Sequence, residues 1–318
     1  MNKPNLIISA CLDYAKCRYN GDVIPFPWAR ELEKFVNIIT VCPEVEMGLG
    51  TPRPTVRLAV NDKSEKRMVD SKTKEDHTDK YNKFFADFEN RALDLDGAIL
   101  KAKSPSCGLV GVKLYNGDFP QEATKGLFAA GLIEKYPYLV TEEEGRLRNY
   151  ILRDHFLTKL FCVSAFKQAF KEGNIANVMD LHAAYKYLFM GYNQNTLREL
   201  GRMLAKYKDY ETMDALAQAY LKKLLILLKR EPSKKNRNNA ILHCFGYFKK
   251  HINAQEKAYF LKTLESYNQE RKPFHAVTSI IEAWTVRYQI EYLSNQKLFN
   301  PYPMELMNVL DSGKGYKI

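Results

Sequence analysis

The sequence predicts two domains: an α/β, Rossmann-like domain with a largely parallel sheet over residues 1–145, and an all-α helical bundle over residues 146–318. In the first half, short apolar runs rich in β-branched residues alternate with helical patterns, which is typical of βαβ units. In the second half, apolar residues recur at the spacing of one helix face, and no strand pattern is convincing. A length of 318 residues accommodates two domains of about 100 to 200 residues each.

The strands of the first domain are predicted from its apolar runs. Gly- and Pro-containing turns at 48–54 and 104–108 separate some of these runs. The charged segment 63–83 contains few β-formers, so we expect an exposed loop that leads into a helix over about 79–93. The four predicted strands are 6–10, 36–41, 55–60 and 97–100.

The helices of the second domain are predicted from stripes of apolar residues. A capping box formed by Thr141 and Glu144 is expected to start the first long helix, which puts the domain junction at 141–150. The predicted helical segments are 147–170, 178–190, 197–207, 213–228, 240–248, 254–267 and 277–293.

Composition excludes several protein classes. A hydrophobic fraction of 46% excludes a disordered or fibrous chain. The apolar runs are far shorter than the roughly 18 to 20 residues of a membrane helix, and the N-terminus lacks the layout of a secretory signal. We therefore expect a cytoplasmic protein without membrane contact, whose six cysteines serve as ligands, catalysts or core residues.

The net charge of +11 lies entirely in the second half. Residues 1–150 contain 22 basic and 22 acidic side chains, whereas residues 151–318 contain 26 and 15. Four of the six cysteines lie in the neutral half. This division suggests a chemical module joined to a module that binds a polyanion.

Three cysteines lie at or just beyond the carboxyl ends of predicted strands. They are Cys11, Cys42 and Cys107, and because parallel strands share one carboxyl edge, we expect their thiols to converge there. Three thiolates from separate loops suit either a tetrahedral Zn²⁺ or a [4Fe–4S] cluster, each with one open coordination position. Cys17 could be a fourth ligand or a neighbouring thiol.

Three motifs carry a resemblance to a known family. Ser-Ala-Cys-Leu-x5-Arg-Tyr-Asn-Gly at 9–21, Val-Cys-Pro-Glu-Val-x-x-Gly-Leu-x-x-Pro-Arg-Pro at 41–54 and Ile-Leu-Lys-x-x-Ser-Pro-Ser-Cys-Gly at 99–108 resemble the signatures of the thiouracil desulfidase family. Residues 180–186 and 239–249 make the second half similar to the helical YbgA-like domain of the family's two-domain branch, RudS, which removes sulfur from 4-thiouridine in tRNA.

The resemblance implies roles for individual residues. It implies a [4Fe–4S] cluster held by Cys11, Cys42 and Cys107 with one open iron, and proton handling by Glu44 and Ser104. From the residues alone, Glu44 could equally be a solvated turn carboxylate and Ser104 a turn cap. Residues 12–16 differ from the commoner small, Gly-containing loop of the family, which affects only the expected shape of that loop.

Basic residues in both halves are candidates for substrate binding. Arg18 and Arg53, in turns near the same edge, could hold a phosphate or could be structural ion-pair partners. His182 and Lys186, at i and i+4, are expected on one helix face, either towards the active site or with His182 in the interior. The densest basic cluster is expected to span a helix end, a loop at 231–239 and the next helix, and to contact RNA; it comprises Lys222, Lys223, Lys229, Arg230, Lys234, Lys235, Arg237, Lys249 and Lys250.

The residues together with this resemblance therefore predict a cluster-dependent tRNA desulfidase that converts 4-thiouridine into uridine without net redox change. Its partner is tRNA, and no obligate protein partner is implied. One alternative is a desulfidase of free thiouracil or thiolated nucleosides, for which the basic half would be unnecessary. Another is an RNA-binding adaptor in which the three cysteines hold a structural Zn²⁺.

Overall fold

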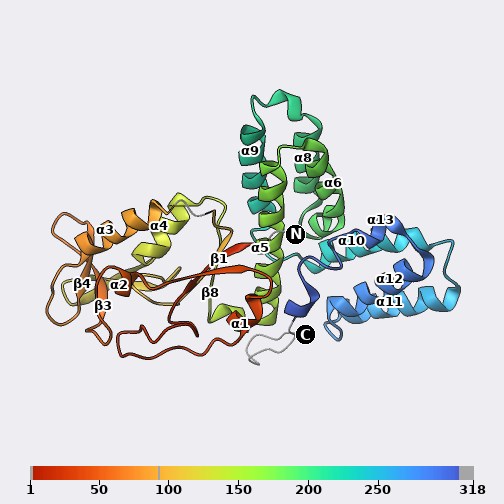
Figure 1. Cartoon of the computed structure of the whole chain (residues 1–318). Helices are drawn as coiled ribbons and strands as arrows, with labels where there is room; N and C mark the ends of the chain where they lie inside the picture. The colour runs from red at the N-terminus through yellow and green to blue at the C-terminus, as the bar shows by residue number, and fades with distance from the viewer. Residues whose placement is uncertain (1–2, 92–93, 308–318) are drawn as a thin grey trace. The chain divides into compact units, whose positions relative to one another are not determined.

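The structure, a computed structural model, describes residues 3–91 and 94–307. The chain divides into two compact units, Met1–Arg148 and Asn149–Ile318 (Figure 1). The predicted fold class is confirmed, because the first unit combines helices with a parallel sheet and the second is helical. In the part of the chain that is described, no helix combines the length and the apolar character needed to cross a membrane.

A four-stranded parallel sheet forms the centre of the first unit. Its strand order is β2-β1-β5-β8, and every neighbouring pair is parallel. Leu6, Ile7 and Ile8 of β1 are fully buried, as expected for an inner strand covered on both faces. The strands are β1 (Asn5–Ser9), β2 (Asn37–Val41), β5 (Gly97–Leu100) and β8 (Val140–Glu143).

A second, mixed sheet was not predicted. Its order is β4-β3-β6-β7, with β3 parallel to β6 and the outer pairs antiparallel. The expected loop within 63–83 is wrong in part, because residues 66–70 pair with β3 through a tight turn. The Asn61 side chain closes that turn by accepting hydrogen bonds from the backbone of Lys63 and Glu65. The strands are β3 (Val56–Val60), β4 (Lys66–Asp70), β6 (Val112–Asn116) and β7 (Phe119–Thr124).

Two helices of the first unit lie side by side and share an aromatic core (Figure 1). Phe88 of α3 meets Phe128 of α4 edge to face, with ring centroids 5.2 Å apart. The predicted end of the first of these helices, Leu93, lies outside the described residues, and α3 ends at Glu89. The helices are α1 (Trp28–Leu32), α2 (Pro43–Glu46), α3 (Thr78–Glu89) and α4 (Leu127–Lys135).

The second unit begins with the long helix α5 at Tyr150. The predicted capping box is wrong, because residues 140–143 form β8; instead, the Asn149 side chain accepts a hydrogen bond from the Leu152 amide. The α-helices are α5 (Tyr150–Lys171), α6 (Ile175–Ala184), α7 (Lys186–Tyr192), α8 (Gln194–Ala205), α9 (Met213–Leu227), α10 (Lys234–Phe245), α11 (Ala254–Asn268), α12 (Phe274–Tyr288) and α13 (Glu291–Ser294). Short 3-10 turns are η1 (Arg146–Arg148), η2 (Tyr207–Asp209), η3 (Gly246–Phe248) and η4 (Met304–Leu306).

Three further predictions about the second unit need correction. The segment 277–293 is not one helix, because α12 ends at Tyr288, Gln289 adopts the left-handed conformation, and α13 begins at Glu291. The segment 178–190 is not one helix: α6 and α7 are separated at Tyr185, so His182 and Lys186 do not share a helix. The predicted loop at 231–239 is helical from Lys234 onwards, because the Ser233 hydroxyl caps α10 by accepting from the Asn236 amide.

Candidate active site

The carboxyl ends of three adjacent parallel strands place three cysteines around one cavity of about 360 Å³. Cys11 lies two residues beyond β1, and Cys42 directly follows β2 as the N-cap of α2. Cys107 lies in the turn after β5. The convergence expected from the strand ends is therefore present, at the edge where α/β proteins place their ligands.

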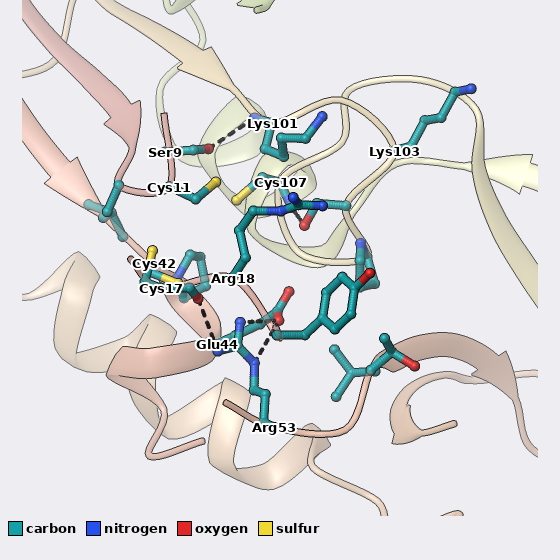
Figure 2. A pocket seen from close by; sticks show the side chains of 18 of the residues that line it. Ser9, Cys11, Cys17, Arg18, Cys42, Glu44, Arg53, Lys101, Lys103 and Cys107 are labelled. Atoms are coloured by element: carbon teal, nitrogen blue, oxygen red, sulfur yellow. Dashed lines mark hydrogen bonds and ion pairs between the residues drawn. The ribbon is translucent and has the colours of Figure 1, made fainter. Parts of the chain in front are cut away.

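Cys17 brings a fourth thiol to the same cavity (Figure 2). A hydrogen bond with the Cys11 thiol raises the pKa of Cys17 to about 11. A hydrogen bond with the Cys17 thiol, together with burial, raises the pKa of Cys42. Burial raises the pKa of Cys107 to about 12, although hydrogen bonds from the Ser9 and Ser104 hydroxyls oppose this. These shifts favour the protonated thiols, so a metal centre that binds them as thiolates would displace protons.

Glu44 is held rigidly at the cavity wall by charged and neutral partners. Its Oε2 accepts hydrogen bonds from Nε and Nη2 of Arg53 at 3.1 and 2.6 Å, and its Oε1 accepts one from the Ser106 hydroxyl at 3.0 Å. The side chains of Arg53 and Glu44 are 6% and 13% exposed. The solvated carboxylate considered for Glu44 is therefore not what the structure shows.

The two candidate arginines differ in their contacts. Arg53 is a structural ion-pair partner: besides Glu44, its Nη1 donates to the backbone oxygens of Cys17 and Gly50 at 3.0 and 3.1 Å. Its expected role as a phosphate ligand is not supported by this arrangement. Arg18 extends across the cavity (Figure 2), and among the described residues its guanidinium contacts the ring of Tyr19, 5.6 Å away, and no carboxylate. Arg18 therefore retains donors for a substrate.

Ser104 organises the turn that carries Cys107. Its Oγ accepts hydrogen bonds from the amides of Ser106 and Cys107 at 3.2 and 3.1 Å, which is the turn-capping arrangement considered from the sequence. The same hydroxyl also reaches the Cys107 sulfur. Ser104 thus positions a candidate ligand in addition to lining the cavity.

Lys101 and Ser106 are site residues that the sequence did not predict. Lys101 lines the cavity and pairs with Glu144, which follows β8. Ser106 is fully buried against Glu44. Both residues lie within the motif at 99–108, so the sequence places them near the site. Their partners, Glu144 and Glu44, are distant in sequence and could not be predicted from the motif.

Comparison with known proteins decides the family of this unit. A family model described as 2-thiouracil desulfurase matches residues 6–144, and one described as a protein of unknown function (DUF1722) matches residues 186–303. Residues 6–144 belong to the 2-thiouracil desulfurase family. All the cavity residues described above lie within this desulfurase-family region.

Two curated relatives and one solved structure each match less than half of the chain. The uncharacterized protein YbgA of Escherichia coli (strain K12) is 26% identical over 136 residues, which are 43% of this chain and 80% of YbgA. The uncharacterized protein YbbK of Bacillus subtilis (strain 168) is 28% identical over 145 residues, 43% of this chain and 95% of YbbK. The solved structure of a [4Fe-4S]-dependent thiouracil desulfidase, TudS, is 30% identical, with 46% of this chain and 93% of that chain covered and a TM-score of 0.37.

The donor set of the desulfurase-family cavity fits an iron–sulfur centre. Thiolates are the protein ligands that iron–sulfur clusters use, and the cavity presents four thiols from three loops, with Cys11 and Cys17 on the same one. Within the described ranges, no three His, Cys, Asp or Glu side chains are grouped closely enough to hold a single metal ion. Cys11, Cys42 and Cys107 could hold such a cluster, and the Cys17 thiol lies beside those of Cys11 and Cys42.

Close backbone packing fixes the Cys107 turn in the desulfurase-family unit. A Cβ atom added at Gly126 would lie 2.4 Å from the Ser106 carbonyl oxygen and 2.9 Å from the Cys107 amide nitrogen. Because these are backbone atoms, Gly126→Ala should lower the free energy of unfolding by about 1 to 3 kcal/mol and reduce iron retention. Thermal unfolding and iron analysis test this. Gly145→Ala is the control, since its Cβ would meet nothing within 4 Å, and equal behaviour of the two variants would contradict the packing argument.

The predicted RNA-contacting residues differ in their exposure and in their contacts within the helical unit. Lys223 pairs with Glu199 at 2.8 Å, Lys234 pairs with Glu270, and half-buried Arg237 lies over the Phe274 ring at 5.1 Å. These three are thus partly occupied by contacts within the helical unit. The exposed members are Lys222, Lys229, Arg230, Lys234, Lys235, Lys249 and Lys250.

His182 is an interior residue of the helical unit. Its Nδ1 lies 2.8 Å from the Tyr220 hydroxyl, and burial lowers its pKa to about 4. The interior alternative for His182 is therefore the one observed. Lys186 lies over the rings of Tyr187 and Tyr292.

Proposed function

We propose that this protein is a [4Fe–4S]-dependent desulfidase that converts 4-thiouridine in tRNA into uridine. The proposal rests above all on one observation: four thiols, a fixed carboxylate and an arginine meet in one cavity at the carboxyl edge of a parallel sheet. Membership of residues 6–144 in the 2-thiouracil desulfurase family supports the removal of sulfur from a pyrimidine ring.

The overall reaction exchanges sulfur for oxygen. A C=S group and water give a C=O group and hydrogen sulfide, so atoms balance and no electrons are transferred. When bound, the cluster would supply a Lewis-acidic iron with affinity for a soft sulfur atom. The protein must then bind the base, exclude bulk water and move the protons of one water molecule.

Glu44 is the residue best placed to move those protons. Arg53 occupies its Oε2, so Oε1, which otherwise contacts the Ser106 hydroxyl, is the oxygen left to exchange a proton with water or with the base. The hydroxyl of Ser104 lies in the same cavity and can donate to the base edge. The guanidinium of Arg18 can bind an anionic part of the substrate.

The charge of the helical unit supports a polyanionic substrate. The basic excess of the chain lies after residue 150, and seven members of its densest cluster are exposed. Backbone contacts of this kind can offset the few kcal/mol that exposing one base of a folded RNA costs. A free base would need no such surface.

Charge reversal on the helical unit should weaken tRNA binding. We expect the triple variant Lys229→Glu, Arg230→Glu, Lys235→Glu to bind tRNA less tightly, with the slope of log K against log salt reduced by about 0.7 to 0.9 for each lost phosphate contact. Filter binding at several salt concentrations measures both effects. The control variant Lys206→Glu, Lys257→Glu, Lys262→Glu changes the net charge equally at exposed positions outside the cluster. Equal losses in the two variants would show that the predicted cluster has no special role.

Two assays separate the proposed function from its alternatives. Protein purified without oxygen should contain iron and acid-labile sulfide, whereas an adaptor with a structural Zn²⁺ would contain zinc. Incubation with thiolated tRNA, followed by nucleoside analysis, should show conversion of 4-thiouridine into uridine. Turnover of free thiouracil with no change in tRNA would identify a free-base desulfidase instead.

A further inference from the structure

A second depression adjoins the cavity that the cysteines line. It has a volume of about 490 Å³, lies over β3 and β6 of the mixed sheet, and is called the flanking groove here. Its polar side chains are Thr55, Arg57, Ser71, Lys103, Lys113 and Tyr115. The groove belongs entirely to the first unit.

The flanking groove is continuous with the cysteine cavity. Four residues, Thr55, Val56, Lys103 and Pro105, line both. Lys103 stands at this boundary with a φ of +60°, and Figure 2 shows its side chain pointing away from the thiols. A ligand that fills the cysteine cavity can therefore extend past Lys103 into the groove.

The groove is positively charged. Its lining includes three cations and, among the described residues, no carboxylate. Arg57 is committed to the Tyr115 ring, 4.6 Å away, and to Asp118 at 3.1 Å, so it forms a rigid wall. Lys103 and Lys113 are exposed and lie on separate segments, the turn after β5 and strand β6. Two exposed ammonium groups in a shallow, carboxylate-free groove suit a phosphate diester.

The size of the cysteine cavity also favours a phosphate diester in the flanking groove. It must hold a metal centre and a pyrimidine ring within about 360 Å³, so the sugar and phosphates of a nucleotide have to leave through its boundary. At the boundary with the groove they would meet Lys103 first and Lys113 next. The cavity alone would suffice for a free base.

We propose that the flanking groove binds the sugar-phosphate backbone next to the reacting base, with Lys103 and Lys113 contacting phosphate. This inference rests on the proposed function, and it places part of the polynucleotide recognition in the desulfurase-family unit as well as in the helical one. It makes a thiolated nucleotide within a chain a better substrate than the free base.

The test compares substrates of increasing size with the full-length, cluster-loaded protein. The substrates are 2-thiouracil, 4-thiouridine 5′-monophosphate and a dinucleotide that contains 4-thiouridine. Lys113→Glu and Lys103→Ala should each raise KM for the dinucleotide about tenfold or more, as expected when a charged hydrogen bond is lost. For Lys113→Glu, kcat/KM for 2-thiouracil should stay within about twofold of the wild-type value, because Lys113 does not line the cysteine cavity. Lys83→Glu, an exposed change on α3, is the control.

The substrates also locate the phosphate. An increase in KM for the dinucleotide alone assigns the groove to the phosphate that links neighbouring nucleotides. An increase in KM for both the dinucleotide and the monophosphate assigns it to the nucleotide's own phosphate. An equal increase in KM for all three substrates, or an unchanged KM for all of them, would overturn the proposal.

A binding measurement keeps this test separate from the proposed function. Fluorescence anisotropy of a labelled, unthiolated oligouridylate requires no turnover, and Lys103→Ala/Lys113→Glu should weaken its binding more than Lys83→Glu does. If the wild-type protein desulfurates nothing but this difference is present, the groove assignment stands and the proposed function fails. Equal oligouridylate binding by the wild-type and double-variant proteins overturns the groove assignment.

Discussion

Cys11→Ala, Cys42→Ala and Cys107→Ala are each expected to abolish iron binding and desulfidase activity. Each removes a thiol at the end of one of three adjacent strands, and the remaining ligands would be too few to hold a cluster with one open iron. Iron and sulfide analysis and visible absorption of anaerobically purified protein measure the loss. Far-UV circular dichroism establishes that each variant is folded.

Cys17→Ala is the matched control for this set, because Cys17 is also buried in the same cavity and its thiol contacts those of Cys11 and Cys42. We expect it to retain iron and the cluster's absorption. An intact cluster in Cys42→Ala, or a cluster lost only in Cys17→Ala, would contradict the assignment of the three ligands.

Glu44→Gln is expected to slow turnover by about 10²-fold or more, which is typical of a missing acid-base group, while iron content is unchanged. The substitution also leaves the guanidinium of Arg53, which is 6% exposed, without its anion. We therefore expect a loss of stability of about 3 to 5 kcal/mol, because one partner of a buried ion pair is removed. Single-turnover rates and thermal unfolding distinguish the two effects.

Ser106→Ala separates the charge of Glu44 from its positioning. It removes one hydrogen bond to Oε1 but keeps the ion pair with Arg53, so we expect a stability loss of about 1 kcal/mol and a smaller effect on turnover. Wild-type turnover in Glu44→Gln would remove that carboxylate from the chemistry. Equal rates in Ser106→Ala and Glu44→Gln would show that Glu44 acts through its position only.

The central strands and the meeting of the cysteines could be predicted because both depend on local patterns. Apolar runs such as that of β1 identify buried strands, and parallel strands bring their carboxyl ends to one edge. The mixed sheet could not be predicted in this way. Strand β4 has the sequence Lys-Arg-Met-Val-Asp, and β7 is almost wholly exposed, so neither shows an apolar pattern.

The partners of the candidate site residues could be predicted only in part. Glu44 and Arg53 are both candidate site residues from the sequence. Spacing along a chain does not tell which way two side chains point, so their ion pair could not be predicted. The role of Ser104 as a turn cap agrees with the local reading of its sequence, because Ser before Pro favours such turns. The predicted starts of α5 and α10 are wrong for two reasons. Residues 140–143 pair with β5 as strand β8, which delays the start of α5, and the Ser233 hydroxyl caps α10 at an earlier residue than predicted.

Reaction of the cluster-loaded protein with 4-thiouridine-containing tRNA in oxygen-18 water tests the central claim most directly. Mass spectrometry of the digested tRNA should show uridine that carries one labelled oxygen, formed in equal amount with the released sulfide and without an added reductant or oxidant. Unlabelled uridine, a requirement for an electron donor, or 4-thiouridine left intact under conditions in which the cluster is present would contradict hydrolytic desulfidation of tRNA by this protein.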